Sequence, residues 1–264
     1  MSANAAAAAG VLIPRRARGW RMGLANMLGK ENTAWWRTRR WWTQCLIALF
    51  FLNLMTALNL RHGGESNAAI SNALNTFLLI AAAVAPLAAI IMGLDAVLGE
   101  RLFGTAAWVL SKPLRRPAFI LAKLIAHGLG LLATWVVLPG VVAYLEFAIL
   151  GKVHLSIPGF AAALGLAYLN LIFYLTLVLM LATLFRGRGP VLGIAIFVLW
   201  GWMITPLGVA LADVMPWRLL MDLGQAEAIL QGQPLPTEAP IIATALWCVL
   251  FTGVAIWRMG REEF

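Results

Sequence analysis

Six long stretches with few or no charged residues constrain the fold more than any other feature of this chain. Each approaches or exceeds the roughly 17–25 apolar residues that an α-helix needs to cross a bilayer. The stretches are continuous rather than alternating, and backbone groups in lipid must be satisfied within the segment, so helices are predicted rather than strands. We expect an all-α integral membrane protein whose six transmembrane helices lie at about 43–60, 70–97, 118–146, 158–185, 190–212 and 240–258.

The composition indicates that lipid is the solvent for most of the chain. Of its 264 residues, 62% are hydrophobic and 12% are charged, whereas soluble domains are about 45–50% apolar and about 25% charged. The length suits one membrane domain over residues 20–264. Residues 1–19 are expected to be a disordered basic start, and their alanines precede their arginines, the reverse of the order in a cleavable signal peptide.

Lysine and arginine are distributed unequally between the two sides of the expected membrane domain. Only Arg61, Lys152 and Arg218 fall on one side, and the other 17 of the 20 cationic residues fall on the opposite side. Loops rich in Lys and Arg stay in the cytoplasm, so both termini are predicted to be cytoplasmic, in a bacterial plasma membrane. The net charge of +9 is explained by this topology signal, and no nucleic-acid partner is expected.

Residues 20–42 are expected to form an interfacial helix on the cytoplasmic membrane surface. Apolar side chains recur along one stripe, at Trp20, Leu24, Met27, Leu28, Trp35 and Trp42. The cations of this region lie on other faces, as in a helix with one side in lipid. Glu31 is an exception, because its carboxylate lies within the stripe. A basic tail attracted to anionic lipid is the alternative interpretation.

A short basic segment joins the second and third expected spans. Leu102, Ala106 and Val109 share one helical face, Pro113 ends the helix, and Pro117 suits the first turn of the next span. The segment is therefore predicted to be a short amphipathic helix that faces the cytoplasm and is tied at both ends to transmembrane helices. A membrane anchor without a partner is the other interpretation.

The sequence "GERLFGTAAWVLSKPLRRPAFILAK" resembles the segment between the second and third spans of ABC-2-type transporter permeases. These are the membrane subunits of ATP-binding-cassette transporters. The residues that match the family pattern are Glu100, Arg101, Gly104, Thr105, Pro113, Arg116 and Lys123. The family often has Ser or Thr where this chain has Arg115.

The resemblance implies a transport role that depends on other subunits. Residues 100–112 would be a cytoplasmic coupling helix that contacts a separate ABC ATPase, with Glu100 and Arg101 as its polar contacts. ATP and Mg would then be held by that partner, so no cofactor is expected in this chain. A second permease copy, as a homodimer or a paired permease, would complete the pathway. The chain would be half of an exporter and not an enzyme by itself.

Other polar residues in the spans are candidates for a site. Asp95 and Lys123 are expected to pair at the cytoplasmic rim. Asn53, Thr56 and Asn59 follow one another at spacings of three, so they either line a pathway or, as is common in membrane bundles, form hydrogen bonds to another helix. His127, alone inside a span, is expected to be a structural residue.

Catalytic and metal-binding motifs are not found in the sequence. It has no P-loop and no nucleophile or metalloprotease motif, and Cys45 and Cys248 have no metal-ligand spacing. An independent channel or an ion-coupled carrier is an alternative, as is a membrane-embedded enzyme or accessory protein. Polar catalytic residues clustered at one membrane depth would support an enzyme, and the sequence lacks them. A channel or carrier should show charged rings or discontinuous helices.

Overall fold

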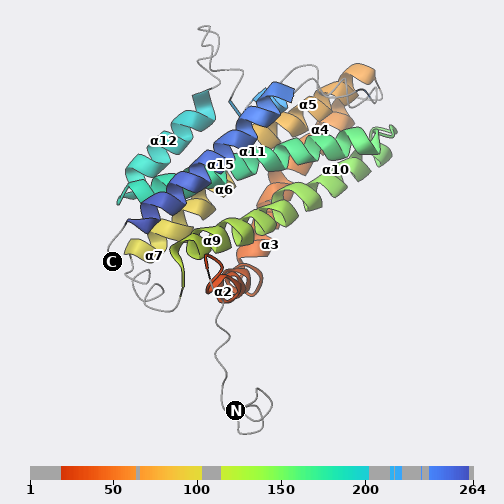
Figure 1. Ribbon diagram of the computed structural model, residues 1–264. Helices are drawn as coiled ribbons and strands as arrows, with labels where there is room; N and C mark the ends of the chain where they lie inside the picture. Colours follow the sequence, from red (N-terminus) through yellow and green to blue (C-terminus); the bar gives the residue numbers. More distant parts are fainter. Residues whose placement is uncertain are drawn as a thin grey trace, which may run out of the picture.

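The computed structural model describes residues 19–63, 66–102, 114–201, 215–216, 218–221, 233 and 238–261, and these residues form helices and turns without a strand (Figure 1). Five helical segments in this part of the chain are long and apolar enough to cross a membrane: Arg40–His62, Asn67–Leu102, Arg116–Ile149, Ile157–Leu184 and Ala239–Gly260. The prediction of an all-α, multi-pass architecture is confirmed.

Three of these segments are built from several consecutive helices. The first contains α3 (Arg40–Ala48), the π-helical segment η1 (Leu49–Leu54) and α4 (Met55–Gly63). The second contains α5 (Asn67–Ala83), α6 (Ala85–Leu94), π-helical η2 (Asp95–Gly99) and α7 (Glu100–Leu102). The third contains α9 (Arg116–Leu131), π-helical η3 (Leu132–Val137) and α10 (Leu138–Ile149).

The remaining helices complete the bundle. They are α11 (Ile157–Leu184), α12 (Arg188–Trp200), the short α13 (Arg218–Met221) and α15 (Glu238–Gly260). The fifth expected span, 190–212, is represented by α12, which has 13 residues. Residues 202–214 lie outside the described part of the chain, so the count of six spans stays a prediction.

Helix α11 lies at the centre of the bundle and packs against α6, α9 and α15. Most of its side chains are buried, including Tyr174 and Val178. A helix that is apolar on every side is stable only where other helices or lipid surround it. The central position of α11 follows from its composition.

Proline interrupts two of the long segments, as the sequence indicates. Helix α5 ends before Pro86, and α6 begins one residue before it. Because proline has no N–H, the carbonyl four residues earlier, that of Ala82, loses its helical donor. Asn170 of α11 replaces that donor, with its Nδ2 3.4 Å from the Ala82 oxygen. Pro139 similarly lies in the first turn of α10, directly after η3.

The surface helix is shorter than predicted. Helix α2 spans Leu24–Trp36, starting after Gly23 at a φ of 82°, and the expected end at residue 42 is wrong. The chain turns at residues 37–39, where the Thr38 hydroxyl accepts the N–H of Arg40 in competition with the helical ladder. Trp42 therefore belongs to the first long segment. Figure 1 shows α2 viewed nearly along its axis, crosswise to the long helices, at the base of α9.

Candidate functional site

Four charged side chains from three helices meet where α2 lies against α9. We call Lys30, Glu31, Glu100 and Lys123 the charge cluster. The Lys123 Nζ lies 2.9 Å from Glu31 Oε1 and 3.2 Å from Glu100 Oε2. Lys30 forms a further ion pair with Glu100 and lies 3.9 Å from Glu31. The cluster joins α2 to the end of the second long segment and to the start of the third.

Lys123 is the most enclosed member of the charge cluster. Its side chain is 1% exposed, compared with 8% for Glu31 and 16% for Glu100. Its ammonium also lies 4.8 Å from the centre of the Phe119 ring, within the range of a cation–π contact. Removing an ammonium from water costs several kcal/mol unless opposite charges compensate it. The two carboxylates provide that compensation, and the four charges sum to zero.

A tryptophan fixes the position of α2 beside the charge cluster. Trp35 is fully buried and its ring lies over Gly130 of α9, where a Cβ atom would be 2.1 Å from the ring. The His127 ring meets Trp35 edge-on at 5.6 Å, and its Nδ1 lies 2.9 Å from the carbonyl of Lys123. His127 is thus buried in a helix interface, in line with its expected structural role. Only glycine at 130 leaves room for this contact.

Two arginines of the sequence signature bind the carboxyl ends of other helices. Arg101 donates from Nη1 to the carbonyl of Ala182 at the end of α11. Arg116 donates to the carbonyl of Met259 at 3.0 Å and to that of Gly260, at the end of α15. The last carbonyls of a helix lack intrahelical donors and carry partial negative charge, so a guanidinium there is stabilising.

The segment between α7 and α9 is also attached to the start of α2. The backbone N–H of Arg115 donates to the carbonyl of Met22 at 3.1 Å. Both ends of residues 100–116 are therefore joined to the surface helix, one through Glu100 and the other through Arg115. Gly104, Thr105 and Pro113 of the signature lie outside the described residues, as does most of the predicted coupling helix 100–112.

The expected pair of Asp95 and Lys123 is wrong. Asp95 Oδ1 instead lies 3.3 Å from Arg188 Nη2, at a site where both side chains are about half exposed. The expectation rested only on the position of both residues near the cytoplasmic rim. Segment η2 begins at Asp95 and is π-helical, and an extra residue in a turn rotates the side chains beyond it by about 100°. Glu100, directly after η2, takes the place beside Lys123.

The three polar residues of the first span form hydrogen bonds within the bundle. Asn53 Nδ2 donates to the Pro139 carbonyl at 3.0 Å and lies 3.5 Å from Glu146 Oε2. Thr56 donates to the carbonyl of its own helix at Leu52. Asn59 Nδ2 lies 3.1 Å from the Thr76 hydroxyl, which is partly open to the surroundings. Of the two interpretations left open above, these contacts favour hydrogen bonding between helices, and a pathway-lining role stays a prediction.

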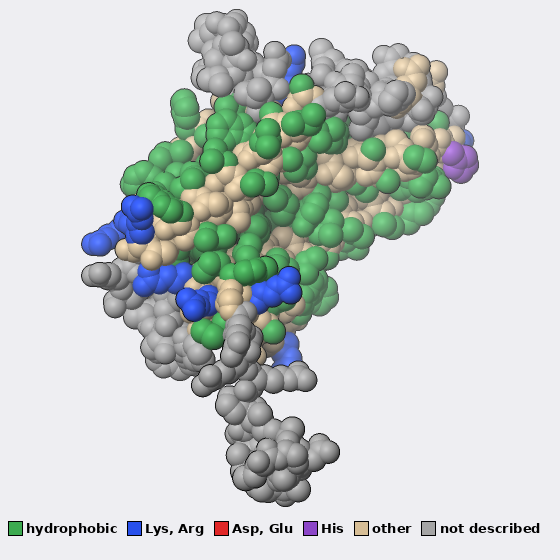
Figure 2. All heavy atoms as spheres, in the orientation of Figure 1, with side chains coloured by type: hydrophobic (Ala, Val, Ile, Leu, Met, Phe, Trp, Pro, Cys, Tyr) green, Lys and Arg blue, Asp and Glu red, His purple; other side chains and the backbone are tan. Residues whose placement is uncertain are grey.

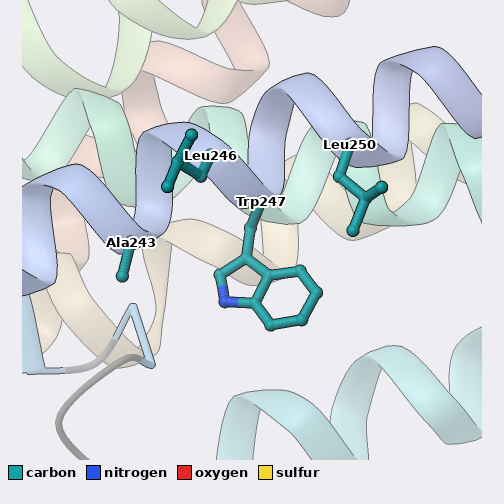
Figure 3. Close-up of a pocket in the computed structure, with 4 residues that line it drawn as sticks. All are labelled: Ala243, Leu246, Trp247 and Leu250. Atoms are coloured by element: carbon teal, nitrogen blue, oxygen red, sulfur yellow. The ribbon is translucent and has the colours of Figure 1, made fainter.

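The hollow on the outer face of α15 is apolar. The close-up in Figure 3 shows one hollow of about 370 Å³ on α15, lined by Ala243, Leu246, Trp247 and Leu250, none of which is charged. Within the same part of the chain, no three His, Cys, Asp or Glu side chains are grouped to hold a metal ion. The arrangement at the charge cluster is suited to holding helices together.

Comparison with known proteins decides the family. Residues 25–264 match the family described as ABC-2 family transporter protein. The chain belongs to this family. It is also 27% identical over 197 residues to a protein of Pseudomonas aeruginosa described as "Probable ABC transporter permease protein NosY", covering 65% of this chain and 70% of that protein. The resemblance inferred from residues 100–123 is confirmed.

Membership makes this chain the permease, the transmembrane subunit of an ABC transporter. It implies pairing with an ABC ATPase and with membrane lipid, and it favours a transport subunit over the channel, carrier and enzyme alternatives. The charged residues of the signature also have contacts inside the permease, and their expected contact with the ATPase stays a prediction. Glu100, Arg101 and Arg116 contact its own helices, and Glu31 is the partner that was missed. The signal for Glu31 was present, since a lone carboxylate in an apolar stripe needs a counter-charge.

Proposed function

We propose that the permease exports its substrate as one of two membrane halves, driven by separate ATPase subunits that bind beneath residues 100–112. Two copies of the chain, or this chain and a related permease, enclose the pathway. ATP and Mg are held by the ATPase subunits. Both termini face the cytoplasm of a bacterial cell, on the side where most of the cations lie.

The observation that carries this proposal is the attachment of residues 100–116 to the bundle. Glu100 is joined to α2 and α9 through the charge cluster. Arg101 is joined to the end of α11, and Arg116 to the end of α15. A displacement applied to this segment is therefore passed to several transmembrane helices at once. Such a connection is what a subunit moved by an external ATPase needs.

We infer from the same contacts that the residues of the signature have two different roles. Glu100, Arg101 and Arg116 transmit the motion inside the permease. The rest of the predicted coupling helix, residues 103–112, includes Gly104 and Thr105 and provides the surface that meets the ATPase. We therefore expect the ATPase contact to be most sensitive to added bulk at Gly104.

Co-purification tests this proposal directly. The permease is expressed with candidate ABC ATPase subunits from the same genome, and the complex is isolated through a tag on the permease. Gly104→Trp is expected to lose the ATPase while the permease still inserts into the membrane. Gly165→Trp is the matched control, because Gly165 is exposed on α11 with no side chain or backbone within 4 Å of a new Cβ. It should retain the ATPase.

Three results would contradict the proposal. The first is an ATPase that stays bound to Gly104→Trp with unchanged hydrolysis. The second is ATP hydrolysis by the purified permease without a partner. The third is a complex whose mass, measured by light scattering, contains a single permease. The direction of transport is tested in inside-out vesicles, where ATP added outside should drive accumulation of substrate.

A further inference from the structure

A groove runs along the membrane-facing side of the third long segment, beginning at the end of α2. It has a volume of about 550 Å³, within the usual range for small-molecule sites. Asn32 and Trp36 form its end on α2. Its walls are apolar and come from the helices that follow α9, including Leu132, Ala133, Val137 and Val141. The groove lies outside the charge cluster and plays no part in the proposed coupling.

The length of the groove matches one leaflet of a bilayer. Its lining extends from Leu129 to Val141, which is about 18 Å along a helix at 1.5 Å per residue. Half of a hydrocarbon core of about 30 Å is about 15 Å. A single acyl chain that starts at the end of α2 would therefore fill the groove and end near the middle of the membrane.

Cationic and aromatic residues follow the α2 end of the groove along the chain. The sequence there is "WWRTRRWW", residues 35–42. The rings of Trp36 and Trp41 lie 6.5 Å apart and both are exposed. Tryptophan prefers the headgroup level, where its ring is in apolar surroundings and its N–H is in water. This end of the groove thus has the composition of a headgroup site.

Two arginines at this turn give the site its charge preference. Arg37 directly follows Trp36, and Arg39 immediately precedes α3. Both side chains are exposed, and neither forms an ion pair or side-chain hydrogen bond within the described residues. Figure 2 shows that Lys and Arg side chains gather at this end of the molecule, while apolar side chains cover the flank of the bundle. A phosphate at the turn would be paired with these cations.

Asn32 adds a hydrogen-bond acceptor to the site. Its Oδ1 is buried, lies at the groove and has no hydrogen-bond partner among the described residues. A buried acceptor without a donor is unfavourable by itself. A hydroxyl of a glycerol headgroup can supply the donor. We propose that the groove binds one anionic phospholipid, with its phosphate at Arg37 and Arg39, its glycerol headgroup near Asn32 and one acyl chain that starts at the end of α2 and runs along the third long segment.

The test is lipid retention by the full-length permease. Permease is reconstituted in vesicles of phosphatidylcholine with one quarter phosphatidylglycerol, extracted in mild detergent, and analysed by native mass spectrometry. Ala133→Trp fills the groove, and Ala161→Trp on α11 is the matched control in an apolar hollow without adjacent cations. We expect wild type and the control to retain one phosphatidylglycerol, and Ala133→Trp to retain none.

The charge preference is tested with exposed arginines, whose replacement leaves the core of the bundle untouched. Arg37→Gln and Arg39→Gln should each lower the retention of phosphatidylglycerol relative to phosphatidylcholine by roughly fivefold, the effect of one cation near an anionic membrane surface. Arg186→Gln removes an equally exposed charge elsewhere on the cation-rich end and should leave the ratio unchanged. These variants keep the test decisive if Ala133→Trp fails to fold.

Each other outcome overturns the proposal. Equal retention of both lipids by wild type would mean a groove that takes any acyl chain. Retention that survives Ala133→Trp would place the lipid elsewhere. A permease dimer that excludes lipid and is disrupted by Ala133→Trp would identify a second copy as the occupant.

Discussion

Replacing Lys123 with methionine tests the charge cluster most directly. Methionine keeps the apolar length of the side chain but removes the ammonium. Glu31, which is 8% exposed, then loses its nearest cation and keeps Lys30 at 3.9 Å. Glu100 still has Lys30 as a partner. Breaking a buried pair on one side costs about 3–5 kcal/mol, and the remaining Lys30 places Lys123→Met near the lower end, at about 3 kcal/mol.

A double substitution separates the ion pair from the packing of Lys123. Glu31→Gln combined with Lys123→Met removes both charges and leaves the Lys30 pair with Glu100 intact. We therefore expect the double variant to lose less stability than the sum of the two single variants, by about 1–3 kcal/mol. The control is Asp95→Asn, because its partner Arg188 and Asp95 itself are about half exposed. An exposed pair of this kind contributes less than about 1 kcal/mol.

Thermal unfolding of the purified permease in lipid nanodiscs measures these differences. A loss of about 3 kcal/mol corresponds to a midpoint lowered by about 6–12 °C for a chain of this size. The reasoning is refuted if Lys123→Met lowers the midpoint no more than Asp95→Asn does. It is equally refuted if the double variant loses the full sum of the single losses, because the two charges would then be independent.

Three further predictions concern the contacts around the charge cluster and the centre of the bundle. Gly130→Ala should destabilise the permease by about 1–3 kcal/mol, because its Cβ meets the Trp35 ring. Adding Trp35→Phe to this variant should recover part of the thermal midpoint. A Gly130→Ala variant as stable as wild type would contradict the contact. Asn170→Leu should lower the free energy of unfolding by about 1 kcal/mol. Adding Pro86→Ala should offset this loss, because alanine restores the missing N–H donor to the Ala82 carbonyl. An equal loss of stability with and without Pro86→Ala would count against this explanation. Arg116→Gln should speed hydrogen exchange in the last turn of α15, measured by mass spectrometry, and unchanged exchange there would show that the guanidinium does not hold that helix end.

Most of the architecture was predictable because it depends on hydropathy and proline. Five of the long apolar runs place membrane-length helices where the structure has them, and Pro86 marks a break in the second of these runs. The end of the surface helix was not predictable from its apolar stripe. There, the hydroxyl of Thr38 competes locally with the helix, and the stripe continues past the turn.

Most of the charged residues at the site could be named from the sequence, but their partners could not. Residues 100, 101 and 116 were selected as ATPase-coupling residues, a role that stays a prediction, and their contacts inside the permease are with helices distant in sequence. The pairing of Lys123 also depends on the extra residue in η2, and hydropathy contains no signal for a π-helical turn. The position of Glu31 in an apolar stripe was a usable signal, because a carboxylate there predicts a cationic partner on another helix.

The pair between Glu31 and Lys123 has a consequence for the order of biosynthesis. The two residues are 92 positions apart in the chain. At a synthesis rate of about 5–20 residues per second, Glu31 leaves the ribosome about 5–18 s before the lysine that neutralises it. During that interval α9 has not been synthesised and α2 cannot pack against it. The tryptophans of α2 can then bind the helix only to the membrane surface. The surface helix is thus synthesised first, but it reaches its final position only after the third long segment has been synthesised.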